Sequence, residues 1–474
     1  MDSKKNKAGA ELNRRGFLKL STGAALAGVG SSMLPGVALA DDDREHISSF
    51  RHHGNDRRLW QKVRKEFVLS KRETYMNVGT TGSIPERVLE NYEDNNEYIS
   101  KHPWGTQVST TELSKQVAAS FGADAHELIL SRNTTDGMCS IIHGLNFQAG
   151  DVILTTNQEH VGGAMPMKIV AQRYDVEVVE LTLPTYTGYE FVTEDDYVRL
   201  FADAVALYGD RVRLICFSHV SYKTGVALPA KRICKEVAVP NRIPTLVDGA
   251  HTPGMFALDF HDIDCDFYAG SGHKWQCGPG STGILYVRDC AKRLRDFWYD
   301  RPQPLFFVNS SYPSGTDVED AYNDPVMFHQ RFQYVGQDNY PAKQALVECC
   351  QMWDAIGRDR IERRILELSA MCKAALRYSF DSDATYYSPD VAELSSGLTT
   401  FNPFWDKTDG VLLTEFRDRL REDYGYIIRT TNFKLHPDDA QDTYALRIST
   451  HLFHDEDDVL GLVRAMKRVY RQLA

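Results

Sequence analysis

Lys274 is the side chain with the clearest chemical potential, because it lies between small polar residues and a glycine-rich turn. Residues 271–277 read SGHKWQC, and residues 278–283 read GPGSTG. A lysine is a nucleophile only after its ammonium group loses a proton, and the apolar neighbours Trp275 and Cys277 supply a partly desolvated setting that favours this loss. Lys274 is therefore a candidate to hold an aldehyde cofactor. Taken alone, the stretch also fits a surface lysine at a turn.

Asp248 is the second candidate, and it follows a short apolar run. Residues 242–247 read RIPTLV, which predicts a buried parallel strand. Open α/β sheets place ligand contacts at the carboxyl ends of their strands. Asp248 and Lys274 are 26 positions apart (274 − 248), about one connection and a further strand, so both can face one crevice. Pyridoxal phosphate (PLP) needs such a pair, a lysine for the Schiff base and a carboxylate that keeps the pyridinium nitrogen protonated.

A candidate anion site precedes both residues in the sequence. Residues 128–130 predict a strand, and residues 131–138, SRNTTDGM, then open a helix. Free backbone N–H groups and the hydroxyls of Thr134 and Thr135 converge at such a helix N-terminus. This arrangement predicts phosphate binding, and a plain threonine N-cap is the alternative.

The elements that must position these residues follow a regular pattern. Between residues 127 and 332, apolar runs such as 152–154 and 214–217 alternate with helical stretches. This alternation predicts a mostly parallel sheet covered on both faces. From about residue 340 helices dominate, which indicates a second, smaller domain.

Together these features resemble the class V aminotransferase family of PLP enzymes, and residues 273–286 are most similar to its isopenicillin N epimerase-like branch. The resemblance extends from about residue 75 to the C-terminus. It implies a homodimer of fold type I, an α/β fold with a mostly parallel central sheet covered by helices. It also implies a smaller C-terminal α+β domain.

The resemblance implies roles for residues around the cofactor. Ser271 and His273 would complete the phosphate cup, and the family pattern favours Thr135 slightly over Thr134. His160 is similar to the family's histidine that stacks on the pyridine ring while Asp248 bonds the ring nitrogen. These assignments, with Lys274 as the lysine that binds PLP and moves the proton at the substrate's α-carbon, are expectations.

Three positions depart from the family pattern. Tyr222 stands where the desulfurases have an asparagine that contacts the cofactor's phenolic oxygen, and His251 is the candidate to take over this contact. Gln337 replaces a threonine that touches the phosphate of the neighbouring subunit. Residues 430–437 contain no cysteine, whereas desulfurases carry their persulfide-accepting thiol in such a loop. Desulfurase activity is therefore not expected.

Substrate contacts are expected near the C-terminus. Arg447 occupies the place of the family arginine that binds the substrate's α-carboxylate through a bidentate pair. A solvent-exposed strand arginine is the alternative. Asn77 would lie near the same carboxylate.

The N-terminal residues 1–40 predict a twin-arginine signal peptide. Arg14 and Arg15 precede Phe-Leu-Lys, an apolar stretch too short to span a bilayer follows, and Ala-Leu-Ala ends at Ala40. This signal predicts export by the twin-arginine machinery to the periplasm. The mature chain then divides into an N-terminal arm at 41–74, a large PLP-binding domain at 75–335 and a small domain at 336–474.

Composition excludes other classes of function. The 474 residues carry a net charge of −11, which argues against nucleic-acid binding. The nine cysteines and the histidines show no metal-ligand spacing, so no metal site is expected. No membrane span is expected in the mature chain.

The reaction stays open at the level of sequence. The expected substrate is a small molecule or peptide with an amine, and transamination, epimerisation, lyase and oxidative chemistry all remain possible. The predicted export and the family resemblance together favour a peptide-linked amino acid as the substrate, as in the maturation of siderophores such as pyoverdine. The alternative from another class is a non-catalytic binding protein that keeps the fold.

Overall fold

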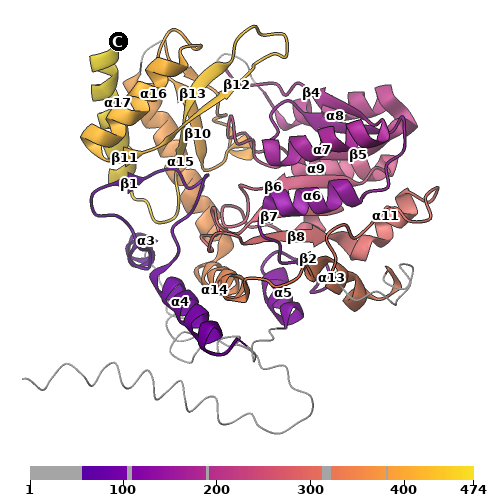
Figure 1. The fold of residues 1–474 in the computed structure, drawn as a ribbon. Coiled ribbons are helices and arrows are strands. Elements are labelled where there is room, and N and C mark those ends of the chain that lie inside the picture. Colours follow the sequence, from indigo (N-terminus) through magenta and orange to yellow (C-terminus); the bar gives the residue numbers. More distant parts are fainter. Residues whose placement is uncertain (1–55, 104–108, 188–191, 312–321, 381–382) are drawn as a thin grey trace, which may run out of the picture.

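The computed structural model describes residues 56–103, 109–187, 192–311, 322–380 and 383–474. A large lobe surrounds a seven-stranded sheet, and a smaller lobe contains a four-stranded sheet (Figure 1). The predicted signal peptide and the first part of the arm lie outside the described residues.

The seven-stranded sheet has the order β2-β8-β7-β6-β5-β3-β4. Every strand except β8 runs in one direction, because β8 is antiparallel to both β2 and β7. The strands of this sheet are β2 (Leu128–Ile129), β3 (Val152–Thr156), β4 (Glu177–Leu181), β5 (Val212–Ser218), β6 (Thr245–Gly249), β7 (Phe267–Ser271) and β8 (Gly283–Val287).

Helices cover both faces of this sheet, because neighbouring residues of a strand point to opposite sides. Phe267 packs in one hydrophobic cluster and Tyr268 in the other, and both are fully buried. One face is covered by α5 (Thr110–Ala119), α8 (Glu194–Tyr208), the short α9 (Ala230–Arg232), the π-helix Ile233–Ala238 and α10 (Phe260–Ile263). The other face is covered by α6 (Thr134–Gly144), α7 (Val161–Tyr174), α11 (Lys292–Phe297) and α13 (Pro325–Gln333).

The small lobe is an α+β unit. Its antiparallel sheet has the order β12-β13-β10-β9, and helices α15, α16 and α17 form its core together with this sheet. The elements are α15 (Arg358–Ser379), β9 (Thr385–Tyr386), β10 (Leu398–Asn402), α16 (Gly410–Tyr424), β11 (Tyr426–Ile427), β12 (Arg429–Phe433), β13 (Thr443–Ser449) and α17 (Glu456–Leu473). The fold-type I class predicted from the sequence is confirmed.

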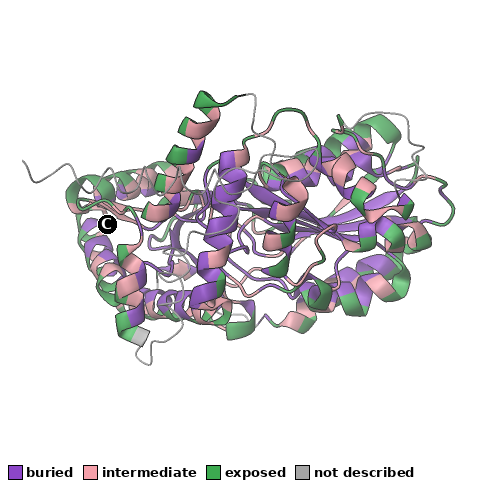
Figure 2. Ribbon diagram, turned by 90° about the horizontal axis from the view of Figure 1, so that it is seen from below, coloured by how far each residue is buried: buried purple, intermediate pink, exposed green. Residues whose placement is uncertain are grey.

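Helix α14 (Tyr340–Ile356) joins the two lobes and is buried along most of its length. Leu346 packs in the core of the large sheet, whereas Trp353 packs near the small lobe. Figure 2 shows the buried residues gathered along the strands and the exposed ones on the outer helices.

The described part of the arm packs on the small lobe. Helix α3 (Asp56–Lys65) buries Leu59 and Val63 in a cluster that includes Phe453. Strand β1 (Thr74–Tyr75) pairs in parallel with β11, and α4 (Glu86–Lys101) contacts α14. The domain boundaries at residues 75 and 336 stay predictions. Within the described residues, no helix is long and apolar enough to cross a membrane.

Candidate active site

Lys274 follows the carboxyl end of β7 in a tightly held turn. The N–H of Cys277 donates to the carbonyl of Lys274 (3.1 Å), and the N–H of Gly82 donates to the carbonyl of His273 (2.8 Å). A Cβ at Gly82 would lie 2.1 Å from the Lys274 carbonyl oxygen, so only glycine allows this approach. The backbone of Lys274 is therefore fixed from two sides.

The ammonium of Lys274 is destabilised by its surroundings. Its pKa is lowered from 10.5 to about 8, mainly by burial; the charge of Asp248 opposes this shift, and the charges of Arg447 and Arg429 add to it. At pH 7 about one tenth of the amine is then unprotonated, a far larger fraction than for an exposed lysine. Lys274 is therefore suited to attack an aldehyde.

Asp248 lies at the carboxyl end of β6 and is 4% exposed. Burial raises its pKa, whereas the backbone N–H of Ala250 (2.9 Å) and the charge of Lys274 lower it. A Cβ at Gly163 of α7 would lie 3.6 Å from Asp248 Oδ2. The carboxylate thus lies between β6 and the start of α7.

Glu159 is a second buried carboxyl group that the sequence analysis did not single out. It accepts hydrogen bonds from the hydroxyl of Thr156 (2.5 Å) and from the N–H (3.1 Å) and hydroxyl (2.6 Å) of Ser218. Burial raises its pKa to about 7, and the charge of Asp248 also raises it. Glu159 thus connects the carboxyl ends of β3 and β5. In the sequence, only its position directly before His160 indicates that it lies near the site.

Two residues of the predicted phosphate cup meet at the start of α6. The hydroxyls of Thr134 and Ser271 lie 2.7 Å apart, and both residues are buried. Thr135 is exposed, and its Oγ1 would lie 2.3 Å from a Cβ at Gly162. The Nδ1 of His273 lies 3.4 Å from a backbone carbonyl oxygen. The structure thus brings the hydroxyls of Thr134 and Ser271 together, whereas the hydroxyl of Thr135 faces Gly162 in α7.

His160 is the N-cap of α7, and its Nδ1 accepts a hydrogen bond from the N–H of Gly162 (3.1 Å). Its ring meets the ring of Tyr222 edge-on, with centroids 5.0 Å apart and an interplanar angle of 82°. Burial and, to a smaller extent, the charge of Lys274 lower the pKa of His160 to about 4, so the ring is neutral at neutral pH. A neutral, exposed ring at this edge can stack on a cofactor.

His251 is buried beside the lysine turn. The indole N–H of Trp275 donates to His251 Nδ1 (3.2 Å), so the proton of the neutral ring lies on Nε2. Burial holds the pKa of His251 well below its usual range. The ring can therefore donate one hydrogen bond through Nε2. Its contact with the phenolic oxygen stays a prediction.

Arg447 in β13 is 1% exposed. Its Nη1 donates to the carbonyl of Tyr222 (3.1 Å). Its Nη2 donates to Asn77 Oδ1 (3.3 Å) and Thr80 Oγ1 (3.4 Å). These partners are neutral, and the buried Nε has no partner among the described residues. Burial, and then the charge of Arg429, lowers the pKa of Arg447 to about 9, so it remains a cation that lacks an anion.

Arg429 is a further residue that sequence reasoning missed. It lies directly opposite Arg447 in the pairing of β12 with β13, and its Nη1 donates to Thr80 Oγ1 (3.2 Å). The sequence shows an arginine in each of two successive strands. It does not show the strand register that places the two arginines opposite each other. Gln337, by contrast, is exposed in the described chain.

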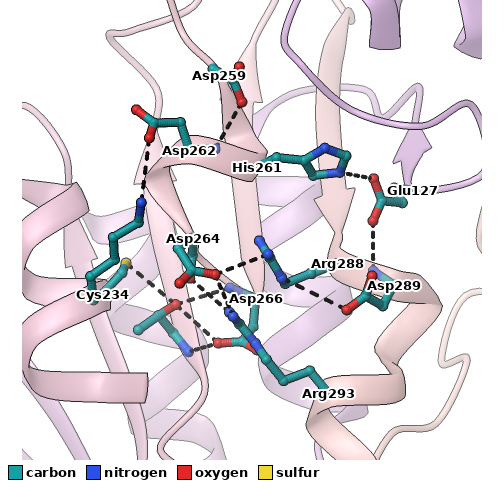
Figure 3. A network of polar contacts seen from close by, with 12 residues as sticks. Glu127, Cys234, Asp259, His261, Asp262, Asp264, Asp266, Arg288, Asp289 and Arg293 are labelled. Atoms are coloured by element: carbon teal, nitrogen blue, oxygen red, sulfur yellow. Dashed lines mark hydrogen bonds and ion pairs between the residues drawn. The ribbon is translucent and has the colours of Figure 1, made fainter. Parts of the chain in front are cut away.

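Away from this site, Glu127 belongs to a polar network (Figure 3). Ligand atoms of Asp124, Glu127 and His261 lie within 4.8 Å of one another. Glu127 Oε2 accepts from the N–H of Asp124 (2.9 Å) and lies 2.7 Å from His261 Nε2, and Oε1 accepts from the N–H of Asp289 (2.7 Å). The network ties the start of β2 to the end of β8. The expected absence of a metal stays a prediction.

The donor set fits PLP. Lys274 would bind the aldehyde carbon, and Asp248 would pair with the ring nitrogen. Thr134 and Ser271, with the N-terminus of α6, would hold the phosphate. His160 would cover one face of the ring.

Residues 75–415 match the model of the family described as aminotransferase class-V. The chain belongs to this family. PLP is its cofactor, and the chain is a PLP-dependent enzyme of class V.

Curated relatives include isopenicillin N epimerases and cysteine desulfurases. The isopenicillin N epimerase of Amycolatopsis lactamdurans is 27% identical over 86% of this chain and 98% of that enzyme. The isopenicillin N epimerase of Streptomyces clavuligerus is 32% identical, but the match spans only 48% of this chain and 56% of that enzyme. A cysteine desulfurase of Pectobacterium carotovorum is 26% identical over 87% of this chain and 98% of that enzyme.

Solved structures share the fold. A cysteine desulfurase from Escherichia coli superposes with a TM-score of 0.69 at 21% identity, over 89% of this chain and 100% of that chain. A variant of C-DES with glycine covalently linked to its PLP cofactor superposes with a TM-score of 0.68 at 22% identity, over 85% of this chain and 98% of that chain.

Proposed function

We propose that this PLP enzyme moves the α-proton of an amino acid, free or at the end of a peptide, in epimerase-type chemistry. Transamination of the same substrates is the second candidate. The observation that carries the proposal is the buried Arg447, whose partners among the described residues are all neutral, at the same site as Lys274 and Asp248. The site thus places a proton-accepting amine near a receptor for a carboxylate.

When bound, PLP makes the α-proton of a substrate amine acidic. Asp248 would keep a negative charge at the ring nitrogen, and Arg447 would orient the substrate through its carboxylate. Lys274 Nζ accepts or returns the α-proton. The buried hydroxyls of Thr134 and Ser271 would hold its phosphate.

Tyr222 favours epimerisation over transamination. An epimerase must move protons on both faces of the α-carbon, and Lys274 serves only one. Tyr222 lies against His160, the ring expected to cover the other side, and burial raises the pKa of its phenol, so it carries a proton at neutral pH. The relatives named isopenicillin N epimerase support the same choice.

The cysteines argue against desulfurase chemistry. Eight of the nine are buried, and the ninth, Cys139, is only partly exposed on α6. None lies between β12 and β13, where a persulfide-accepting thiol is expected. Desulfurases are nevertheless among the relatives, so release of sulfide from cysteine belongs in the assay.

The direct test is attachment of the cofactor followed by proton exchange. Borohydride reduction of the purified protein should fix PLP on the peptide that contains Lys274, and Lys274→Ala should abolish this attachment. Mapping of the adduct to another site lysine, such as Lys223, contradicts the assignment. Amino acids in deuterated water should then exchange the α-proton and change configuration, whereas keto-acid formation without racemisation indicates transamination.

We also propose export to the periplasm by the twin-arginine route, with peptide-linked residues of siderophores as natural substrates. The support is the twin arginine at Arg14 and Arg15. Cell fractionation of the wild type and a variant with both arginines replaced by lysine tests the location. A mature protein in the periplasm of both strains contradicts the route.

We propose a homodimer, supported by an apolar stripe on α7. Val161, Met165 and Ile169 are 60%, 46% and 39% exposed and lie one turn apart, directly after His160. A second subunit would bury this stripe beside the site. Sedimentation of the wild type and of Met165→Lys tests the proposal, and a monomeric wild type contradicts it.

A further inference from the structure

The pairing of Arg429 with Arg447 is unusual, because two like charges lie directly opposite each other in an antiparallel ladder. Opposed residues share one face of a sheet, with their side chains in contact range, and like charges there are destabilising. Both guanidinium groups also donate to the same neutral atom, Thr80 Oγ1, at 3.2 and 3.4 Å. The two cations therefore converge on one place.

Neither arginine is neutralised by the described chain. Within the described residues, no carboxylate lies within 4.0 Å of either guanidinium group. Nearby arginines of α16 behave differently. Arg419 lies 2.5 Å from Glu415, and Arg421 lies 3.1 Å from Glu73. A cation pair left without a counterion, one member of it buried, indicates a receptor for anionic groups of a ligand.

The two arginines occupy different depths. Arg447 is buried and is held by the carbonyl of Tyr222 and by Asn77, whereas Arg429 is exposed. Arg447 is therefore placed for the carboxylate nearest the reacting carbon, and Arg429 for a group further out. The charge of Arg429 nevertheless reaches inward, because it lowers the pKa of Lys274 and of His160.

We propose that Arg429 binds a second anionic group of the substrate, so that the substrate is an amino acid or peptide end with an acidic group beyond its α-carboxylate. This inference rests on the proposed function for the identity of the reacting end. The second group is a carboxylate or another anion of similar size, since a guanidinium fork pairs with such groups through two parallel hydrogen bonds.

Calorimetry with simple anions tests the receptor without requiring turnover. The holoenzyme is titrated with glutarate and with its neutral-ended monoamide. We expect glutarate to bind about tenfold more tightly, the ratio that one charge-assisted hydrogen-bonded contact provides. In Arg429→Gln the ratio should fall toward one, because the affinity for glutarate falls much more than that for the monoamide.

Two variants serve as comparisons. Arg447→Lys should weaken glutarate and the monoamide alike, because both present the first carboxylate. Arg419→Gln removes the same charge from α16 and should keep the wild-type ratio. Equal affinity of the wild type for glutarate and its monoamide overturns the proposal. An unchanged affinity ratio in Arg429→Gln also overturns it, because Arg429 then does not bind the second carboxylate. Failure of the proposed function gives a different result, no cofactor fixed to Lys274 by borohydride.

Discussion

The desolvation of Lys274 predicts that this residue destabilises the cofactor-free protein at neutral pH. Its folded-state pKa of about 8 lies below its usual value of 10.5. Below about pH 8 the lysine is protonated in both the folded and the unfolded chain, and the folded state bears the full cost. Between the two values the unfolded chain binds more protons, so stability rises with pH. Above both values the cost is zero.

The magnitude follows from the shift. The difference of about 2.5 pH units (10.5 − 8) corresponds to about 3 kcal/mol at pH 7, at about 1.36 kcal/mol per unit. The same two pKa values give about 2 kcal/mol at pH 9 and less than about 1 kcal/mol at pH 10. Lys274→Met removes the amine and keeps the side-chain length, so it should stabilise the cofactor-free protein by these amounts.

The assay is urea unfolding of cofactor-free wild type and Lys274→Met at pH 7, 9 and 10. Lys115→Met, at an exposed position of α5, controls for the apolar substitution itself. The diagnostic quantity is the change in the stability difference with pH, because a gain in packing by methionine does not depend on pH. A stability difference that stays constant from pH 7 to pH 10 would refute the desolvation of the amine.

Three further variants test the remaining parts of the site. Asp248→Asn should retain cofactor but lower kcat by about 100-fold, because an amide provides no charge at the ring nitrogen; near-wild-type turnover contradicts this role. Thr134→Val should weaken PLP binding about tenfold in fluorescence titrations, because the hydroxyl shared with Ser271 is lost; unchanged affinity places the phosphate elsewhere. Tyr222→Phe should slow α-proton exchange of one enantiomer far more than the other, and equal slowing removes it as the second proton carrier.

The positions of Lys274, Asp248 and the Thr134 hydroxyl followed from the sequence for one physical reason. Each comes after a short apolar run that forms a strand of the large sheet, and most strands of that sheet run in one direction. The carboxyl ends of parallel strands meet at one edge. The order of residues along the strands therefore places these three at one edge of the sheet, and their roles toward the cofactor stay predictions.

The contacts that the sequence did not predict depend on pairing across the fold. Arg429 and Arg447 are 18 positions apart (447 − 429), and only the register of β12 against β13 makes them opposed. Glu159 is buried against the end of β5, where the hydroxyl of Ser218 donates to it. Neither contact produces a periodic pattern in the sequence, because each involves a single pair of residues.

The charges of the site are coupled, and this coupling connects substrate binding with the chemistry of Lys274. Arg447 and Arg429 both lower the pKa of the lysine through their positive charge. Anionic groups of a substrate bound at these two arginines offset that charge, so the pKa of any free amine at Lys274 rises when an acidic substrate occupies the site. By linkage, the protonated amine must then hold the anion more tightly than the neutral amine does. The arginines thus favour a neutral nucleophile before the substrate arrives and a proton donor after it has bound.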